Sequence, residues 1–187
     1  MGYAMGGVGA PVRTVMAWVC ALAMGLALAG CTRPGSEVSG TPTSTWGADE
    51  QQRSIDAVQR YIDVWTEISQ SIDTTEAADW NRIYEVAGDP LAKNHISFWS
   101  VWKEDGQHLV GKPTITVNSV RDVLYDGQGY KQNVHTCYDA TNAFLYEADG
   151  SRVDNRGLDR RLVTYVVVNS GAGEYRVTDL LMEDKEC

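Results

Sequence analysis

The sequence predicts an α+β domain over residues 49–187, with N-terminal helices packed on one face of a strongly curved antiparallel sheet. Residues 49–103 place apolar side chains at helical spacing, whereas residues 114–182 hold β-branched runs separated by short glycine-containing breaks. Breaks of this kind join antiparallel neighbours. A helical half followed by a strand half is typical of α+β proteins.

The clearest predicted helix covers residues 49–71, where Asp49 and Gln52 are spaced like a capping box. Apolar side chains recur every three or four positions along it, at Ile55, Val58, Ile62, Trp65, Ile68 and Ile72. This period predicts one buried face and one polar face.

Two further helices are expected before the sheet. Residues 73–86 predict a shorter one, and Asp89 and Pro90 predict the N-cap and first residue of another that reaches about residue 103. The last of these carries Ile96, Phe98, Trp99, Val101 and Trp102. Side chains of this size require a large surface to pack against.

Five strands are predicted, over residues 114–126, 130–139, 143–149, 160–169 and 174–182. The fourth strand is apolar on both faces. Leu162, Val166 and Val168 occupy one face, and Val163, Tyr165 and Val167 occupy the other. Such a strand is covered on both faces. The helices supply one cover, and the other is a second subunit, a partner protein or the rest of the sheet.

Acidic residues outnumber basic ones by 25 to 16, which gives a formal net charge of −9. A chain of this sign repels phosphate groups. Nucleic acid and anionic lipid head groups are therefore poor candidates for direct partners of the folded part.

The first 30 residues are typical of a secretory signal. One basic residue, Arg13, precedes an uncharged apolar run over residues 15–29, which as a helix covers about 22 Å and is too short for a bilayer of about 30 Å. The run ends in Leu28-Ala29-Gly30-Cys31, which resembles the lipobox of bacterial lipoproteins. That resemblance implies that Cys31 receives diacylglycerol and becomes the N-terminus of a protein held on the extracytoplasmic side of the cell membrane.

Residues 31–48 are predicted to be a flexible tether that follows the lipidated cysteine. Twelve of the sixteen residues from 32 to 47 are Gly, Pro, Ser or Thr, a composition that cannot bury enough apolar surface to fold. A chain of that length reaches roughly 20 Å. The domain is therefore expected to sit just clear of the membrane.

The exported domain retains two of the four cysteines, Cys137 and Cys187. In an oxidising compartment they predict one disulfide that pins the C-terminus onto the sheet, the alternative being two free thiols. The three histidines, His95, His108 and His135, lack metal-ligand spacing. Neither a metal nor a cofactor is expected.

No pattern in the sequence identifies a catalytic residue. The candidate bases and their hydrogen-bonding partners are Asp122, Tyr125, His135, Tyr138, Asp139 and Tyr165. Strand alternation places His135 and Asp139 on the face opposite Tyr138, and Cys137, which is assigned to the disulfide, shares their face. We therefore expect the two residues to be polar groups of a rim or of the surface, the alternative being a catalytic pair. The residues expected to line a pocket, or else to pack in the core, are Trp65, Trp99, Trp102 and Tyr165.

Residues 49–187 resemble the NTF2-like (SnoaL-like, cystatin-like cone) lipoproteins of mycobacteria and related actinobacteria. The resemblance rests on Val134-His135-Thr136-Cys137-Tyr138-Asp139, Leu145-Tyr146-Glu147-Ala148-Asp149-Gly150, Arg160-Arg161, Gly173-Glu174-Tyr175-Arg176-Val177-Thr178-Asp179-Leu180 and Cys187. Similar proteins commonly have Trp where Tyr175 stands. The resemblance implies a bent sheet that cradles the helices around a conical cavity.

Three functions are compatible with this fold, because fold alone fixes no activity. The leading one is a non-enzymatic envelope lipoprotein that binds a small apolar molecule or a protein partner. The second is an isomerase or hydratase, and the third is an assembly module that dimerises through the outer sheet face, where Val163 and Tyr165 are expected. An apolar cavity favours binding, whereas a buried carboxylate or His with a facing Tyr favours catalysis.

Overall fold

The computed structural model describes residues 47–72, 77–124, 130–153, 159–171 and 173–187. The predicted signal sequence, Cys31, Tyr125 and nearly all of the predicted tether lie outside these ranges. Thr41–Cys187 forms one compact unit that contains the whole hydrophobic core described below, so it meets the requirement for a domain that folds on its own. Among the described residues, no helix has the length and hydrophobicity needed to cross a bilayer.

Helices occupy the first half of this unit, as predicted: α1 (Ala48–Gln70), α2 (Ala77–Trp80), α3 (Ile83–Val86) and α4 (Leu91–Asp105). The capping box is wrong, because Gly47 is the N-cap and no side chain caps the helix, so Asp49 lies inside the first turn. In the described part of the helix predicted over 73–86, the chain instead forms two short helices, α2 and α3. Pro90, not Asp89, caps α4, and Asp89 forms an ion pair with Lys93 at 2.6 Å.

The strands are β1 (His108–Gly111), β2 (Thr114–Leu124), β3 (Tyr130–Asp139), β4 (Ala143–Tyr146), β5 (Arg160–Asn169) and β6 (Tyr175–Met182). They form two antiparallel sheets, a four-stranded one in the order β2-β3-β5-β6 and a two-stranded one of β1 and β4. The predicted α+β class is confirmed. The sequence did not indicate β1, and one continuous sheet was expected where two are present.

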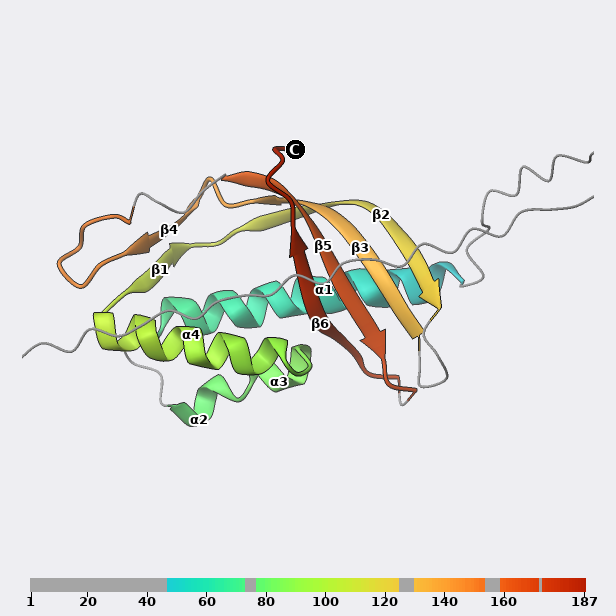
Figure 1. The fold of residues 1–187 in the computed structure, drawn as a ribbon, viewed down its shortest axis with the longest axis horizontal. Helices are drawn as coiled ribbons and strands as arrows, with labels where there is room; N and C mark the ends of the chain where they lie inside the picture. Colours follow the sequence, from blue (N-terminus) through green and yellow to red (C-terminus); the bar gives the residue numbers. More distant parts are fainter. Residues whose placement is uncertain (1–46, 73–76, 125–129, 154–158, 172) are drawn as a thin grey trace, which may run out of the picture. The chain divides into compact units, whose positions relative to one another are not determined.

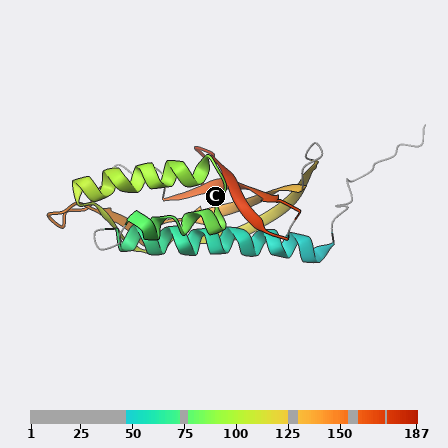
Figure 2. The same cartoon turned by 90° about the horizontal axis from the view of Figure 1, so that it is seen from below.

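The helices cover one face of the four-stranded sheet (Figures 1 and 2). α1 lies along that face and contacts all four of its strands as well as β1, while α4 and α3 pack against β6. The core between these layers is formed mainly by apolar side chains, of which Val58, Ile83, Trp99, Val134 and Val177 have no exposed surface. Burial of this shared face stabilises both the helices and the sheet.

The central strand β5 is buried on both faces, as its sequence predicts. Val163, Thr164, Tyr165, Val166 and Val167 are all at most 6% exposed. The assignment of Val163 and Tyr165 to an outer, dimerising face is wrong, because both belong to the cluster packed against the helices. The outer face carries Thr164 and Val166 instead, since neighbours along a strand alternate.

Several buried polar groups are paired between elements, whereas the Thr66 hydroxyl and the Trp80 indole N–H are buried without a partner among the described residues. The Trp99 indole N–H donates to the Ser69 hydroxyl at 2.9 Å, which ties α4 to α1. Ser54 on α1 donates to the Gln132 side chain on β3, and the Gln132 amide donates to Asp122 on β2 at 2.8 Å. These bonds fix the position of α1 over the sheet, because an unpaired polar group here would be costly.

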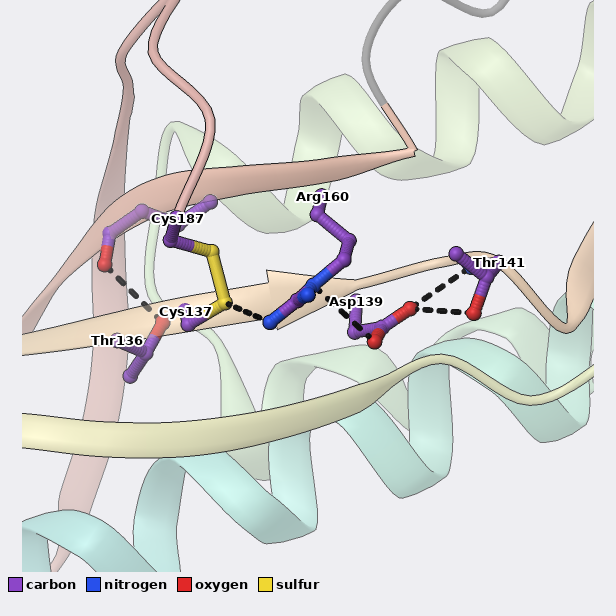
Figure 3. Close-up of a disulfide and its surroundings, with 7 residues drawn as sticks. Thr136, Cys137, Asp139, Thr141, Arg160 and Cys187 are labelled. Carbon is purple, nitrogen blue, oxygen red and sulfur yellow. Dashed lines mark hydrogen bonds and ion pairs between the residues drawn. A yellow bond between two sulfur atoms is a disulfide. The ribbon is translucent and has the colours of Figure 1, made fainter.

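The predicted disulfide between Cys137 and Cys187 is confirmed, and the alternative of two free thiols is wrong (Figure 3). The two Cα atoms lie 5.7 Å apart, and the Arg160 guanidinium lies 3.8 Å from the Cys137 sulfur. The backbone N–H of Glu183 donates to the Leu162 carbonyl at 3.0 Å, and the N–H of Leu162 donates to the Lys185 carbonyl at 3.1 Å. The C-terminal segment is therefore fixed to the start of β5.

We expect replacement of both cysteines by alanine to lower the free energy of unfolding by up to about 4 kcal/mol, because the bond closes a loop with a sequence separation of 50. Urea titration of Thr41–Cys187, followed by tryptophan fluorescence, measures the change. Reduction of the native domain should produce the same loss. An unchanged midpoint in both experiments would show that the bond contributes no stability.

Candidate functional site

A cavity of about 570 Å³ lies between the C-terminal half of α1, α4 and the strands of both sheets. Its lining residues are Tyr61, Ile62, Trp65, Asn94, His95, Phe98, Trp102, Leu109, Tyr138, Ala140, Ala143, Leu145, Val153, Asp159, Arg161, Val163, Tyr165, Leu180 and Met182. Most of them are aliphatic or aromatic. The volume falls within the roughly 300–1,000 Å³ of small-molecule sites.

Burial divides the lining into a floor and a rim. We call Tyr61, Ile62, Val163 and Tyr165 the floor, because none of them is more than 4% exposed. Phe98 on α4 and Met182 on β6 belong to the rim, at 49% and 61% exposed. The cavity therefore runs from the core to a hydrophobic opening.

Three of the four residues expected to form a pocket line this cavity: Trp65, Trp102 and Tyr165. Trp65 and Trp102 contact edge to face, with ring centroids 6.5 Å apart, and so join α1 to α4 at one wall. Trp99 does not line the cavity. It is fully buried behind the wall, where it bonds Ser69 and stacks on His95.

The cavity holds a tyrosine–histidine pair that the sequence analysis missed. The Tyr61 hydroxyl on α1 and Nε2 of His95 on α4 lie 2.6 Å apart and share a hydrogen bond. Burial lowers the pKa of His95 from 6.5 to about 4, and burial together with Tyr138 raises the pKa of Tyr61. Both groups are therefore uncharged at neutral pH.

The spacing of residues along α4 is the sequence feature that could have identified His95 as a cavity residue. His95, Phe98 and Trp102 stand at i, i+3 and i+7, so they share one face of the helix, and all three line the cavity. A search for metal-ligand spacing does not detect a histidine that pairs with a tyrosine from another helix. Only the packing of α4 against α1 brings the two together.

The Tyr165 hydroxyl is the other polar group of the floor. The ring lies edge-on to Tyr61, with centroids 6.0 Å apart. Within the described ranges, the Tyr165 side chain makes no hydrogen bond, although the residue is 98% buried. Burial, with smaller effects of Tyr61 and Tyr138, raises the pKa of this hydroxyl, so it keeps its proton.

The candidate bases suggested by the sequence do not gather at this cavity. Nδ1 of His135 bonds the Thr164 hydroxyl at 2.8 Å, and Asp139 is held by Arg160 and Thr141 (Figure 3). Neither of them lines the cavity, whereas Tyr138, on the opposite face of β3, does. No group of three or more metal-ligating side chains occurs in the part of the chain that the structure describes.

Comparison with known proteins leaves the family open. No protein-family model and no curated protein matches the chain. Among solved structures, the intermembrane space region of the chloroplast protein ARC6 is similar, at 14% identity and a TM-score of 0.49, over 73% of this chain and 96% of that one. A likeness at this level identifies neither the family nor the function.

We expect the domain to lose about 2 kcal/mol of stability between pH 7 and pH 5 through His95. The unfolded imidazole, with a pKa near 6.5, gains a proton in this range, whereas the folded one, with a pKa of about 4, does not. Stability therefore falls as the pH is lowered towards 4. Urea titrations across this range measure the slope, and His95→Gln should flatten it.

His108→Gln is the matched control, because His108 lies outside the cavity lining. This variant should retain the slope of the native domain. If the His95→Gln slope equals that of the native domain, His95 is not buried in its neutral form.

Proposed function

We propose that this protein is an envelope lipoprotein whose domain is NTF2-like and binds a small, largely apolar molecule in the cavity between α1, α4 and the sheets. The observation that carries the proposal is the cavity itself, about 570 Å³ in volume and lined mainly by aliphatic and aromatic side chains. A core of this size is normally close-packed, so an apolar space that opens through a hydrophobic rim is suited to a ligand.

The order of elements supports the NTF2-like assignment. A long helix and shorter helices precede an antiparallel sheet, and the last strand carries an aromatic, Tyr175, as in the family that the sequence resembles. Helices and both sheets enclose the cavity, which is the arrangement expected of a cone. The proposal therefore places the ligand inside the cone and leaves the outer sheet face for a second copy or an envelope partner.

The membrane anchor is supported by sequence alone. The apolar run over residues 15–29, the small residues before Cys31 and the Gly, Pro, Ser and Thr-rich segment after it give the order that lipidation requires. Two acyl chains hold a protein stably at a bilayer, whereas one is marginal. A domain tethered in this way meets apolar molecules where they are concentrated.

An enzyme of the isomerase or hydratase type is the second candidate, and the Tyr61–His95 hydrogen bond favours it. A general base works best when its pKa lies near the operating pH. The pKa of His95 is about 4, which makes it a weak base at neutral pH. Binding is therefore the better-supported function, with the pair serving as a fixed polar contact.

Filling the cavity should weaken ligand binding. Leu145→Trp adds bulk at a lining position of β4, so the apolar dye N-phenyl-1-naphthylamine should bind at least tenfold more weakly than to the native domain. Tyr146→Trp, at the next position of the same strand and outside the lining, should leave dye affinity unchanged. Fluorescence titration of Thr41–Cys187 measures both.

If the native domain fails to enhance dye fluorescence, or if both tryptophan variants bind as the native domain does, the cavity is not the binding site.

Lipidation is tested separately in the full chain. Cells fed radiolabelled palmitate should incorporate the label into the native chain and not into the Cys31→Ala variant. The native chain should fractionate with membranes. Absence of label from the native chain would remove the anchor from the proposal and leave the cavity argument in place.

A further inference from the structure

Three polar side chains at the inner end of the cavity, Tyr61, His95 and Tyr165, are uncharged at neutral pH. Tyr61 and His95 share their hydrogen bond of 2.6 Å, and Tyr165 lies beside them with its ring 6.0 Å from that of Tyr61. Burial holds the tyrosines protonated and the imidazole neutral. The described part of the floor therefore contains hydrogen-bonding groups but no charge.

Within this group, Tyr165 is the residue whose hydroxyl can donate a hydrogen bond to a ligand. Tyr61 is engaged with His95, whereas the Tyr165 side chain has no hydrogen-bond partner among the described residues and is 98% buried. The Tyr165 side chain lines a cavity large enough for a ligand, and its hydroxyl is not among the completely enclosed side-chain atoms that lack a partner, so a molecule in the cavity can reach it. An acceptor atom on a bound molecule would satisfy it.

We propose that the cavity selects uncharged, mainly apolar molecules that carry an accepting oxygen, a carbonyl or a hydroxyl, which receives a hydrogen bond from Tyr165 while the hydrocarbon part lies against Trp65, Trp102 and Phe98. This ligand class deepens the proposed binding function and rests on it. The oxygen lies at the floor, and the apolar part of the ligand extends towards the rim.

Arg161 would favour a different orientation for a ligand that carries a carboxylate. Arg161, Val163 and Tyr165 line the cavity from alternate positions of β5, so Arg161 stands about 13 Å along the strand from Tyr165. A carboxylate bound near Arg161 would direct its hydrocarbon tail to the floor and leave the Tyr165 hydroxyl unpaired. A carboxylate at the floor would be a buried charge without a cation beside it.

The test compares three ligands of matched chain length: methyl octyl ketone, decane and decanoate. Each displaces N-phenyl-1-naphthylamine from Thr41–Cys187 at pH 7, and displacement gives its affinity. We expect the ketone to bind about tenfold more tightly than decane, as one net hydrogen bond allows, and decanoate to bind no more tightly than decane.

Tyr165→Phe isolates the hydroxyl because it preserves the ring. This variant should bind ketone and decane equally, with decane affinity within about twofold of the native value. Tyr175→Phe is the matched control, since Tyr175 is a buried tyrosine of the neighbouring strand that does not line the cavity, and it should retain the preference for the ketone. The infrared carbonyl band of the bound ketone should shift to lower frequency in the native domain and not in Tyr165→Phe.

Equal binding of all three ligands by the native domain, tighter binding of decanoate, or a ketone preference that survives in Tyr165→Phe would each overturn the inference and leave apolar binding intact. If none of the ligands displaces bound dye, the proposed binding function fails with it. If Tyr165→Phe does not fold, the relative affinities of the three ligands for the native domain still test the inference.

Discussion

The structure depends on the burial of one face of α1 against the four-stranded sheet. This helix contacts β2, β3, β5 and β6, and its residues Val58, Ile62 and Ile68 are almost completely buried. The Ser54–Gln132–Asp122 hydrogen bonds fix one half of the helix to the sheet. Towards its C-terminus, α1 packs against α4 through Trp65 and Trp102, and the cavity lies between that contact and the strands.

The cavity floor and the surface differ in charge. Acidic residues exceed basic ones over the whole chain, yet the polar groups of the floor are the neutral hydroxyls of Tyr61 and Tyr165. Ion pairs such as Arg82–Glu67 and Lys112–Asp63 involve half-exposed side chains, which contribute little to stability. Hydrophobic packing and the disulfide therefore stabilise the fold, and the surface charge serves solubility.

Much of the fold could be predicted from the sequence because long elements have clear periods. β3 and β5 have the predicted bounds, and α1 differs by one residue at each end. β1 was not predicted, since four residues are too few to show alternation, and its pairing with β4 places Gly111 where a side chain would overlap the Asn142 carbonyl. The face of Tyr165 on β5 could not be deduced, because both parities of that strand are apolar.

Of the residues at the site, only the large aromatic ones could be predicted from the sequence. Trp65, Trp102 and Tyr165 are large residues on elements that meet, whereas the partnership of His95 with Tyr61 depends on how two helices pack. Trp99 has the same residue type and helix as Trp102, yet it lies behind the wall because its position turns it towards α1 and Ser69. The spacing of residues predicts which side chains share a face of a helix. Tertiary packing determines which of them border a cavity.

Native mass spectrometry of the protein purified from its own cells tests the central claim most directly, because it weighs the folded chain together with whatever occupies the cavity. We predict a bound species of one uncharged, mainly apolar molecule per chain, which is lost on unfolding and is absent from the Leu145→Trp variant. A native chain that always has the bare mass of the polypeptide, with or without the proposed anchor, under conditions that keep the disulfide and fold intact, would contradict the account.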